Sequence, residues 1–162
     1  MEPEKIYQIL AEVTDPEIPV LNILDLGIVR NVQIEQDRVL VTITPTYSGC
    51  PAMKTIEFDI MASLHEAGIR EFEVKTVLDP AWTTDWMTEE GKKKLAAYGI
   101  AAPIGKSDAR RIEALFAEPV QPACPQCGSM ESKLLSQFGS TACKALYQCQ
   151  SCKEPFDYFK CH

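Results

Sequence analysis

The hydrophobic residues near the start of the chain follow helical spacing first and strand spacing afterwards. Apolar residues over positions 6–13 recur in steps of three and four, which predicts a helix that ends before Pro16. Between residues 28 and 43 the period changes to two, and the polar stretch 35–38 interrupts it in the middle. This alternation predicts a hairpin with one buried face.

A second helix, a third strand and a third helix are predicted further along. Apolar side chains over 53–67 recur at helical spacing, with Pro51 as the first helical residue and Gly68 as the residue that ends the helix. Residues 72–77 alternate as a strand does. Thr88 is a good N-cap for the third helix, because acidic residues follow it directly and lysines come later. The order α-β-β-α-β-α predicts an α+β fold, a compact two-layer domain.

The net charge excludes some functions. It is −7 over 162 residues, and residues 1–119 carry 12 Lys and Arg against 20 Asp and Glu. A nucleic-acid surface needs clustered positive charge, so we expect no nucleic-acid partner. No apolar run is long enough to span a bilayer and the first residues lack a signal-peptide pattern, so we expect a cytoplasmic protein with no membrane contact.

The seven cysteines are concentrated at the C-terminal end, where six of them follow residue 123. Four form the pairs CPQC and CQSC, which are separated by 21 residues. Two CxxC turns joined by a hairpin present four thiolates to one ion, so one structural zinc is predicted. A rubredoxin-like iron, an iron–sulfur cluster, four free thiols and two disulfides are the alternatives. The predicted ligands are Cys124, Cys127, Cys149 and Cys152.

This concentration of cysteines also marks a boundary in the chain. We expect residues 1–105 to form the α/β domain, residues 106–122 to form a linker or short helix, and residues 123–162 to form a small zinc-ribbon-like module. The front domain has no glycine-rich phosphate loop, so a nucleotide cofactor is not expected.

Three further groups near the predicted metal site could coordinate. Cys143 precedes Cys149 by six residues, while Cys161 and His162 are the last two residues. Each is more often a packed or surface side chain than a ligand. Because they lie close in sequence to the predicted ligands, we keep these three as candidate additional ligands.

Cys50 lies where a thiol can become reactive. It precedes the second predicted helix, whose free N–H groups and positive dipole end stabilise a thiolate. The alternative is a small side chain that packs at a strand-to-helix turn. Loop residues would have to form any pocket around Cys50, although loop acids usually form turns or caps. The candidates are Asp15, Glu17, Asp25, Trp82 and Asp85.

Several segments resemble a known family. DPEIPVLNILDLGIV, TPTYSGCP and DPAWTTDWMTEEGKKKLAAYGIA are similar to the small α/β domain of iron–sulfur cluster assembly factors. Joined to the cysteine-rich segment that begins with CPQCGS, nearly the whole chain resembles the D-subunit family of the bacterial phenylacetyl-CoA epoxidase system. Neither half is distinctive by itself, whereas the combination is specific.

The resemblance implies an accessory role in aerobic phenylacetate degradation. Family members are thought to help mature the metal centres of the epoxidase system, so its oxygenase and reductase components are the implied partners. The iron–sulfur cluster of the reductase is the natural client. The cysteine of the GCP turn, here Cys50, is the position expected to hold a transient iron or cluster. The two CxxC pairs match the zinc positions, and Cys143 and Cys161 match family cysteines of less certain role.

Several functions compete at this point. The first is a non-enzymatic maturation factor, in which Cys50 and a second thiol from the client or a homodimer mate briefly hold an iron–sulfur species. The second is a zinc-braced scaffold subunit of the oxygenase complex without metal transfer. A thiol oxidoreductase ranks last, because a redox CxxC normally opens a helix next to a βαβ unit. A catalytic oxygenase is disfavoured, since a di-iron carboxylate site needs paired Glu-x-x-His motifs and the chain has two histidines.

Overall fold

The computed structural model describes residues 2–104 and 120–160, which divide into two compact units. The first unit contains the chain up to Trp82 together with Trp86–Gly91. The second contains Thr83–Asp85 and the chain from Lys92 onward. The predicted linker or short helix at 106–122 lies mostly outside the described residues.

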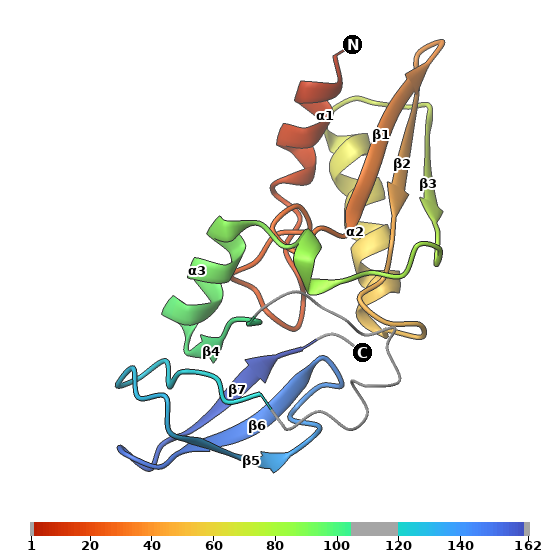
Figure 1. Ribbon diagram of the computed structural model, residues 1–162. Coiled ribbons are helices and arrows are strands. Elements are labelled where there is room, and N and C mark those ends of the chain that lie inside the picture. The colour runs from red at the N-terminus through yellow and green to blue at the C-terminus, as the bar shows by residue number, and fades with distance from the viewer. Residues whose placement is uncertain (1, 105–119, 161–162) are drawn as a thin grey trace. The chain divides into compact units, whose positions relative to one another are not determined.

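The first unit consists of two helices and a three-stranded sheet (Figure 1). Its elements are α1 (Pro3–Leu10), β1 (Val29–Glu35), β2 (Arg38–Ile43), α2 (Ala52–Glu66) and β3 (Phe72–Thr76). The strand order is β1-β2-β3, with β1 antiparallel and β3 parallel to β2. Helix α1 packs on α2 and β1, and α2 packs on β3 (Figure 1). Helices packed on a mixed sheet confirm the predicted α+β fold class.

The hydrophobic pattern sets the position of each element in this unit. The predicted polar stretch becomes a two-residue turn, in which Gln36 and Asp37 have φ of 48° and 73° as a type I′ hairpin turn requires. Helix α2 begins at Ala52 with Pro51 as its N-cap, so placing Pro51 inside the helix was wrong by one residue. Gly68, with φ 83°, ends the helix as predicted.

Much of the core comes from a segment without regular secondary structure. Between α1 and β1 the chain is too rich in turn residues for a helix, yet five of its apolar side chains are almost completely buried. Their burial adds to the hydrophobic stabilisation of the unit. They are Ile18, Leu21, Ile23, Leu26 and Ile28.

Thr44 follows β2 and carries a buried hydroxyl. Its backbone N–H donates to Ile28 O at 2.9 Å, but within the described residues its Oγ1 has no hydrogen-bond partner. A buried hydroxyl without a partner costs about 1–3 kcal/mol. We therefore expect Thr44→Val, which keeps the shape, to stabilise the first unit by roughly 1 kcal/mol and to raise its Tm by about 4–8 °C.

Thermal unfolding followed by circular dichroism measures this change. Thr42→Val is the matched control, because Thr42 lies two residues earlier, on β2, and is only half-buried. A lower Tm for Thr44→Val than for the wild type would mean that the hydroxyl has a partner in solution.

The chain between β3 and the third helix is held by the loop that precedes β1. The 3-10 helix η1 (Thr84–Trp86) and helix α3 (Glu89–Tyr98) follow one another there. Thr88 is confirmed as the N-cap, since its Oγ1 accepts the Gly91 N–H at 2.9 Å. Asp25 holds this cap by two hydrogen bonds, from the Thr88 N–H and from the Thr88 hydroxyl. Among residues 2–104 and 120–160, every helix is too short or too polar to cross a bilayer.

The second unit is built on a four-stranded sheet (Figure 1). Its strands are β4 (Ile100–Ala101), β5 (Ser132–Ser136), β6 (Lys144–Cys149) and β7 (Pro155–Phe159). The order is β4-β7-β6-β5, in which β4 is parallel to β7 and the other pairs are antiparallel. Strand β4 is only two residues long and follows α3 directly in the chain, after Gly99.

One face of this sheet carries a small core. Tyr147 stacks on Phe156 and meets Tyr158 edge-on, with ring centroids 6.0 and 5.7 Å apart. Such aromatic contacts add to the stabilisation from buried area. The core comprises Ala101, Cys124, Ala145, Tyr147, Cys149, Phe156 and Tyr158. Two of the predicted metal ligands are therefore also core residues.

Candidate metal centre and the Cys50 turn

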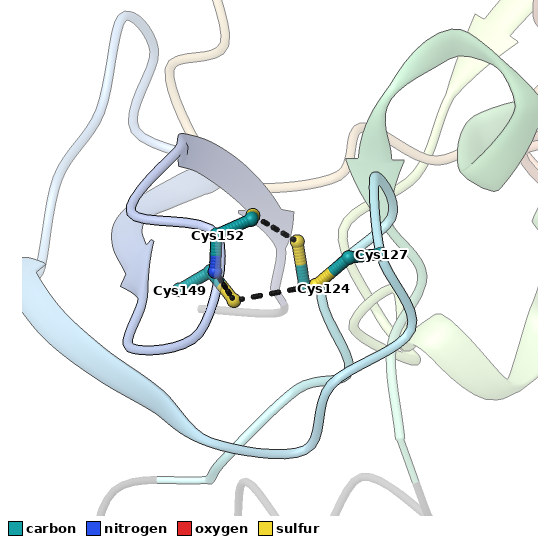
Figure 2. Close-up of side chains that lie close together, drawn as sticks. All are labelled: Cys124, Cys127, Cys149 and Cys152. Atoms are coloured by element: carbon teal, nitrogen blue, oxygen red, sulfur yellow. Dashed lines mark hydrogen bonds between the residues drawn. The ribbon is translucent and has the colours of Figure 1, made fainter.

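The four cysteines of the CxxC pairs meet at one point in the second unit. Their sulfur atoms all lie within 4.8 Å of one another. Figure 2 shows the side chains of the first pair facing those of the second. Cys124 Sγ is 3.7 Å from Cys152 Sγ, and Cys127 Sγ is 3.6 Å from Cys149 Sγ. Among the described residues this is the group of donors that could hold a metal ion.

The first pair lies in a tight turn ahead of β5. The Gly128 N–H donates to Cys124 O and the Cys124 N–H donates to Ser129 O, both at 2.8 Å. Gly128 has φ 75°, a conformation that glycine adopts without steric cost. These two bonds close the chain into a knuckle that presents Cys124 and Cys127 on the same side.

The second pair forms a similar knuckle between β6 and β7. The Cys149 N–H donates to Glu154 O at 3.0 Å, and the Cys152 N–H points to Cys149 Sγ at 3.4 Å. Lys153 has φ 67° and so takes the position of Gly128 in the first knuckle. This conformation could not be predicted from residue type, because lysine rarely adopts it.

The arrangement fits a tetrahedral metal site better than disulfides. With zinc–sulfur bonds of about 2.3 Å, the sulfurs of a tetrahedral site are about 3.8 Å apart, close to the two separations above. A disulfide would need about 2.05 Å. In each knuckle the first cysteine is buried and the second is exposed. Cys124 and Cys149 are therefore shielded from solvent, whereas Cys127 and Cys152 are accessible to it.

The local hydrogen bonds also prepare one thiolate for a cation. The N–H of Cys152, together with that of Ser151, donates to Cys149 Sγ and lowers the pKa of Cys149 to about 6, although burial opposes the shift. The Glu154 N–H donates to Cys152 and by itself lowers the pKa of that thiol. Burial and the neighbouring thiols have a larger, opposite effect and raise the pKa of Cys152 to about 12. A divalent cation among the sulfurs would have the opposite effect on Cys152, because a nearby positive charge favours the thiolate.

These pKa values predict that zinc binding weakens as the pH falls. At neutral pH Cys149 is largely ionised, whereas Cys152 must lose a proton when the metal binds. The apparent affinity should change about tenfold per pH unit for each proton released, and the dependence should steepen below the pKa of Cys149. Competition with a chelating dye at pH values between about 5 and 9, corrected for the dye's own protonation, measures this. An affinity that does not change with pH would contradict it.

Cys143 lies apart from this group. It is buried, and its sulfur is 3.1 Å from the Thr141 hydroxyl. It does not belong to the metal-binding group found among the described residues. Cys161 and His162, the other two candidate additional ligands, lie outside the described residues.

Cys50 lies at the turn between β2 and α2, as its position in the sequence predicts. It is half-buried and directly precedes the N-cap residue Pro51. Its N–H donates to Tyr47 O and its carbonyl accepts the Met53 N–H, both at 3.2 Å. Gly49 has φ 82°, and a methyl group added there would meet no atom within 4 Å. The turn therefore leaves open space beside Cys50 on the Gly49 side.

The candidate pocket residues of the early loop have structural contacts. Asp15 is buried, and its Oδ1 accepts the N–H groups of Glu17 and Ile18 at 2.8 Å, which closes a turn. Glu17 belongs to the same turn. Asp25 caps α3 through Thr88, as described above. A further role for Asp15, Glu17 and Asp25 around Cys50 stays a prediction.

The tryptophan segment is also engaged in packing. Trp82 is buried and its indole N–H donates to Leu26 O at 2.8 Å. Asp85 is exposed, and its backbone N–H donates to the Thr83 hydroxyl at 3.0 Å. Their assignment to a Cys50 pocket is likewise still a prediction.

Two family models match the chain, one for each part. Residues 3–80 match the iron-sulfur cluster assembly protein family, and residues 108–160 match the PaaD zinc beta ribbon domain. Two solved structures resemble the first part. A domain of unknown function (DUF59) from Bacillus anthracis has TM-score 0.53 at 32% identity and covers 57% of this chain and 89% of its own. A conserved hypothetical protein from Thermotoga maritima has TM-score 0.51 at 30% identity and covers 59% and 94%.

Relatives whose names state a function fall into two groups. An Fe-S protein maturation auxiliary factor from Porphyromonas gingivalis is 37% identical over 57% of this chain and 89% of its own length. The putative D subunit of the 1,2-phenylacetyl-CoA epoxidase of Escherichia coli is 48% identical over 97% of this chain and 92% of its own length. The second match spans both units, including the CxxC pairs. The chain therefore belongs to the D-subunit family of 1,2-phenylacetyl-CoA epoxidases.

Proposed function

We propose that this protein is a non-enzymatic accessory factor that assists iron–sulfur cluster assembly in the phenylacetyl-CoA epoxidase system. Its clients would be the oxygenase and reductase components, with the reductase cluster as the main one. Cys50 would be a transient ligand of the iron or cluster. The four cysteines of the CxxC pairs would hold one structural zinc ion. The protein would work in the reducing cytoplasm, where these thiols stay free.

The observation that carries this proposal is the combination of two family matches in one chain. A relative named as a maturation factor matches the front part, and a relative named as an epoxidase component matches nearly the whole length. A protein that shares both relationships is well suited to serve the metal centres of that one system.

Cys50 suits a transient ligand because of its position. It is half-buried and directly precedes the N-cap of α2, and the Gly49 side of this turn is open. One protein thiolate holds a cluster weakly, so a second thiol must come from the client or from a homodimer mate. Handover is then ligand exchange: a client thiolate replaces the Cys50 thiolate on iron, and no electron is transferred.

The metal centre suits a structural role. Two of its four cysteines are part of the core of the second unit, and all four positions of a tetrahedral ion are filled by protein. A closed set of four thiolates leaves no open position for a substrate, which is typical of structural zinc.

The test is anaerobic reconstitution of the full-length protein with ferrous iron and sulfide, followed by transfer to the cluster-free reductase. We expect wild type to restore the visible absorption and the electron transfer of the reductase, and Cys50→Ser to lose at least about tenfold in transfer rate. Cys143→Ser is the matched control, because it also removes one thiol that lies outside the metal-binding group.

Equal transfer by wild type and Cys50→Ser would remove the role of Cys50. The alternative of a zinc-braced scaffold predicts a different set of results. It predicts no transfer by any variant, stable co-purification with the oxygenase, and normal cluster content of the reductase in cells that carry Cys50→Ser.

A further inference from the structure

The two knuckles of the metal centre are joined by hydrogen bonds that do not involve the cysteines. The Gln150 N–H, inside the second knuckle, donates to Glu131 O at 2.8 Å. Ser129 Oγ and Ser151 Oγ lie 2.9 Å apart. Both bonds connect the segment just after the first knuckle with the interior of the second.

Ser129 is tied to its own knuckle on several sides. Its carbonyl accepts the Cys124 N–H at 2.8 Å, and its hydroxyl accepts the Glu131 N–H at 3.2 Å. The hydroxyl can therefore accept from Glu131 and still donate its proton to Ser151. A displacement of Ser129 would move the backbone that places Cys124.

Ser151 is tied to the second knuckle in the same way. It lies between Cys149 and Cys152 in the chain, and the Cys152 N–H, one residue on, points to Cys149 Sγ at 3.4 Å. A displacement of Ser151 would move the backbone next to Cys152 and disturb this contact. The hydroxyl pair thus links the backbones of the two cysteine pairs.

We propose that Ser129 and Ser151 are positioning residues of the metal site, whose hydroxyl pair holds the two knuckles at metal-binding spacing and slows the release of the ion. The inference rests on the metal site in the proposed function. Complete release of the ion breaks its bonds to sulfurs of both knuckles, and the serine pair opposes the separation of the knuckles that helps to break them. Ser151 is exposed and Ser129 is half-buried, so water competes for the bond and the effect is modest.

The primary test is the rate at which the zinc-loaded, full-length protein releases zinc to an excess of chelating dye. We expect Ser151→Ala to release zinc about threefold faster than wild type, as the loss of one partly exposed hydrogen bond gives. Ser151→Ala is the cleanest variant, because the Ser129 hydroxyl is the partner that the structure gives its side chain. Ser129→Ala should accelerate release at least as much, since it also loses the Glu131 bond.

The double variant shows whether the two serines act through one shared hydrogen bond or independently. If the two hydroxyls act through one shared bond, Ser129→Ala/Ser151→Ala should release zinc no faster than Ser129→Ala alone. Ser129→Thr, which keeps the hydroxyl, should stay near the wild-type rate. Ser136→Ala is the matched control, because Ser136 also uses its hydroxyl in the second unit, toward Phe138 O, but outside the knuckles.

The outcomes distinguish this inference from the proposed function. The cobalt-loaded variants should keep the wild-type absorption bands, which shows that the ligand set is unchanged. The proposed role of the serine pair would be overturned by a wild-type release rate in Ser151→Ala. Effects that multiply in the double variant, or an equal acceleration by Ser136→Ala, would overturn it as well. A wild-type protein that retains no zinc at all would instead contradict the structural zinc site itself.

Discussion

Replacing Cys149 by serine is expected to abolish zinc retention and to unfold the second unit, while the first unit stays folded. Cys149 is fully buried and belongs both to the four-sulfur group and to the small core. A serine oxygen is a poor replacement for a zinc thiolate. Zinc affinity should therefore fall by more than about 100-fold, because loss of a residue that only hydrogen-bonds to a ligand already costs up to that much. Structural zinc contributes about 10 kcal/mol or more to small modules of this kind.

The measurement is zinc content together with amide resonances in two-dimensional NMR. The amides of residues 120–160 should collapse to the centre of the spectrum, whereas those of β1, β2 and α2 should keep their dispersion. Removal of zinc from wild type with a strong chelator should give the same pattern. Cys143→Ser is the control, because Cys143 is equally a buried cysteine of the second unit. Full zinc retention by Cys149→Ser would show that the ion is held elsewhere.

Replacing Gly27 by alanine is expected to destabilise the first unit by about 3 kcal/mol or more. Gly27 has φ 68°, a conformation that costs other residues about 1–2 kcal/mol. An added Cβ would also lie 2.3 Å from Trp86 O, well inside any permitted contact. Relief requires movement of the backbone at Trp86, whose ring lies 3.5 Å from the Arg30 guanidinium. Leu26, which directly precedes Gly27, accepts the Trp82 indole N–H on its carbonyl oxygen, so a shift at Gly27 would also disturb this bond.

Gly68→Ala isolates the clash from the backbone strain. Gly68 has φ 83°, but a Cβ added there meets no atom within 4 Å, so this variant should lose only the backbone cost of about 1–2 kcal/mol. Urea unfolding followed by tryptophan fluorescence compares the two, and Gly27→Ala should have the clearly lower midpoint. Equal midpoints would mean that the loop around Trp86 yields easily and does not depend on Gly27.

The metal centre is the part of the site that could be predicted most fully from sequence. Each CxxC pair is a local turn of four residues, so its spacing already determines that two thiols face the same way. The Cys50 turn could be located for a similar reason, because a strand pattern, a glycine, a proline and a helical pattern follow one another within a short segment. The helices and the hairpin of the first unit also depend on patterns a few residues long.

The serine pair, Gly27 and strand β4 could not be predicted in this way. Ser129 and Ser151 are 22 positions apart and resemble any other turn serines until the knuckles come together. The need for glycine at position 27 depends on the backbone of Trp86, which is far away in the chain. Strand β4 is two residues long, so it has no measurable period.

The sequence by itself determined the α+β class, the hairpin turn, the helix caps and the two cysteine pairs of this protein. All of these depend on interactions between residues close together in the chain, where steric preference and hydrophobic period act directly. Only the tertiary structure decided that Ile100 and Ala101 complete the sheet of the metal unit, that Asp25 holds the Thr88 cap, and that two serines join the knuckles. Those contacts join residues distant in sequence, and folding brings them together only after the local elements have formed.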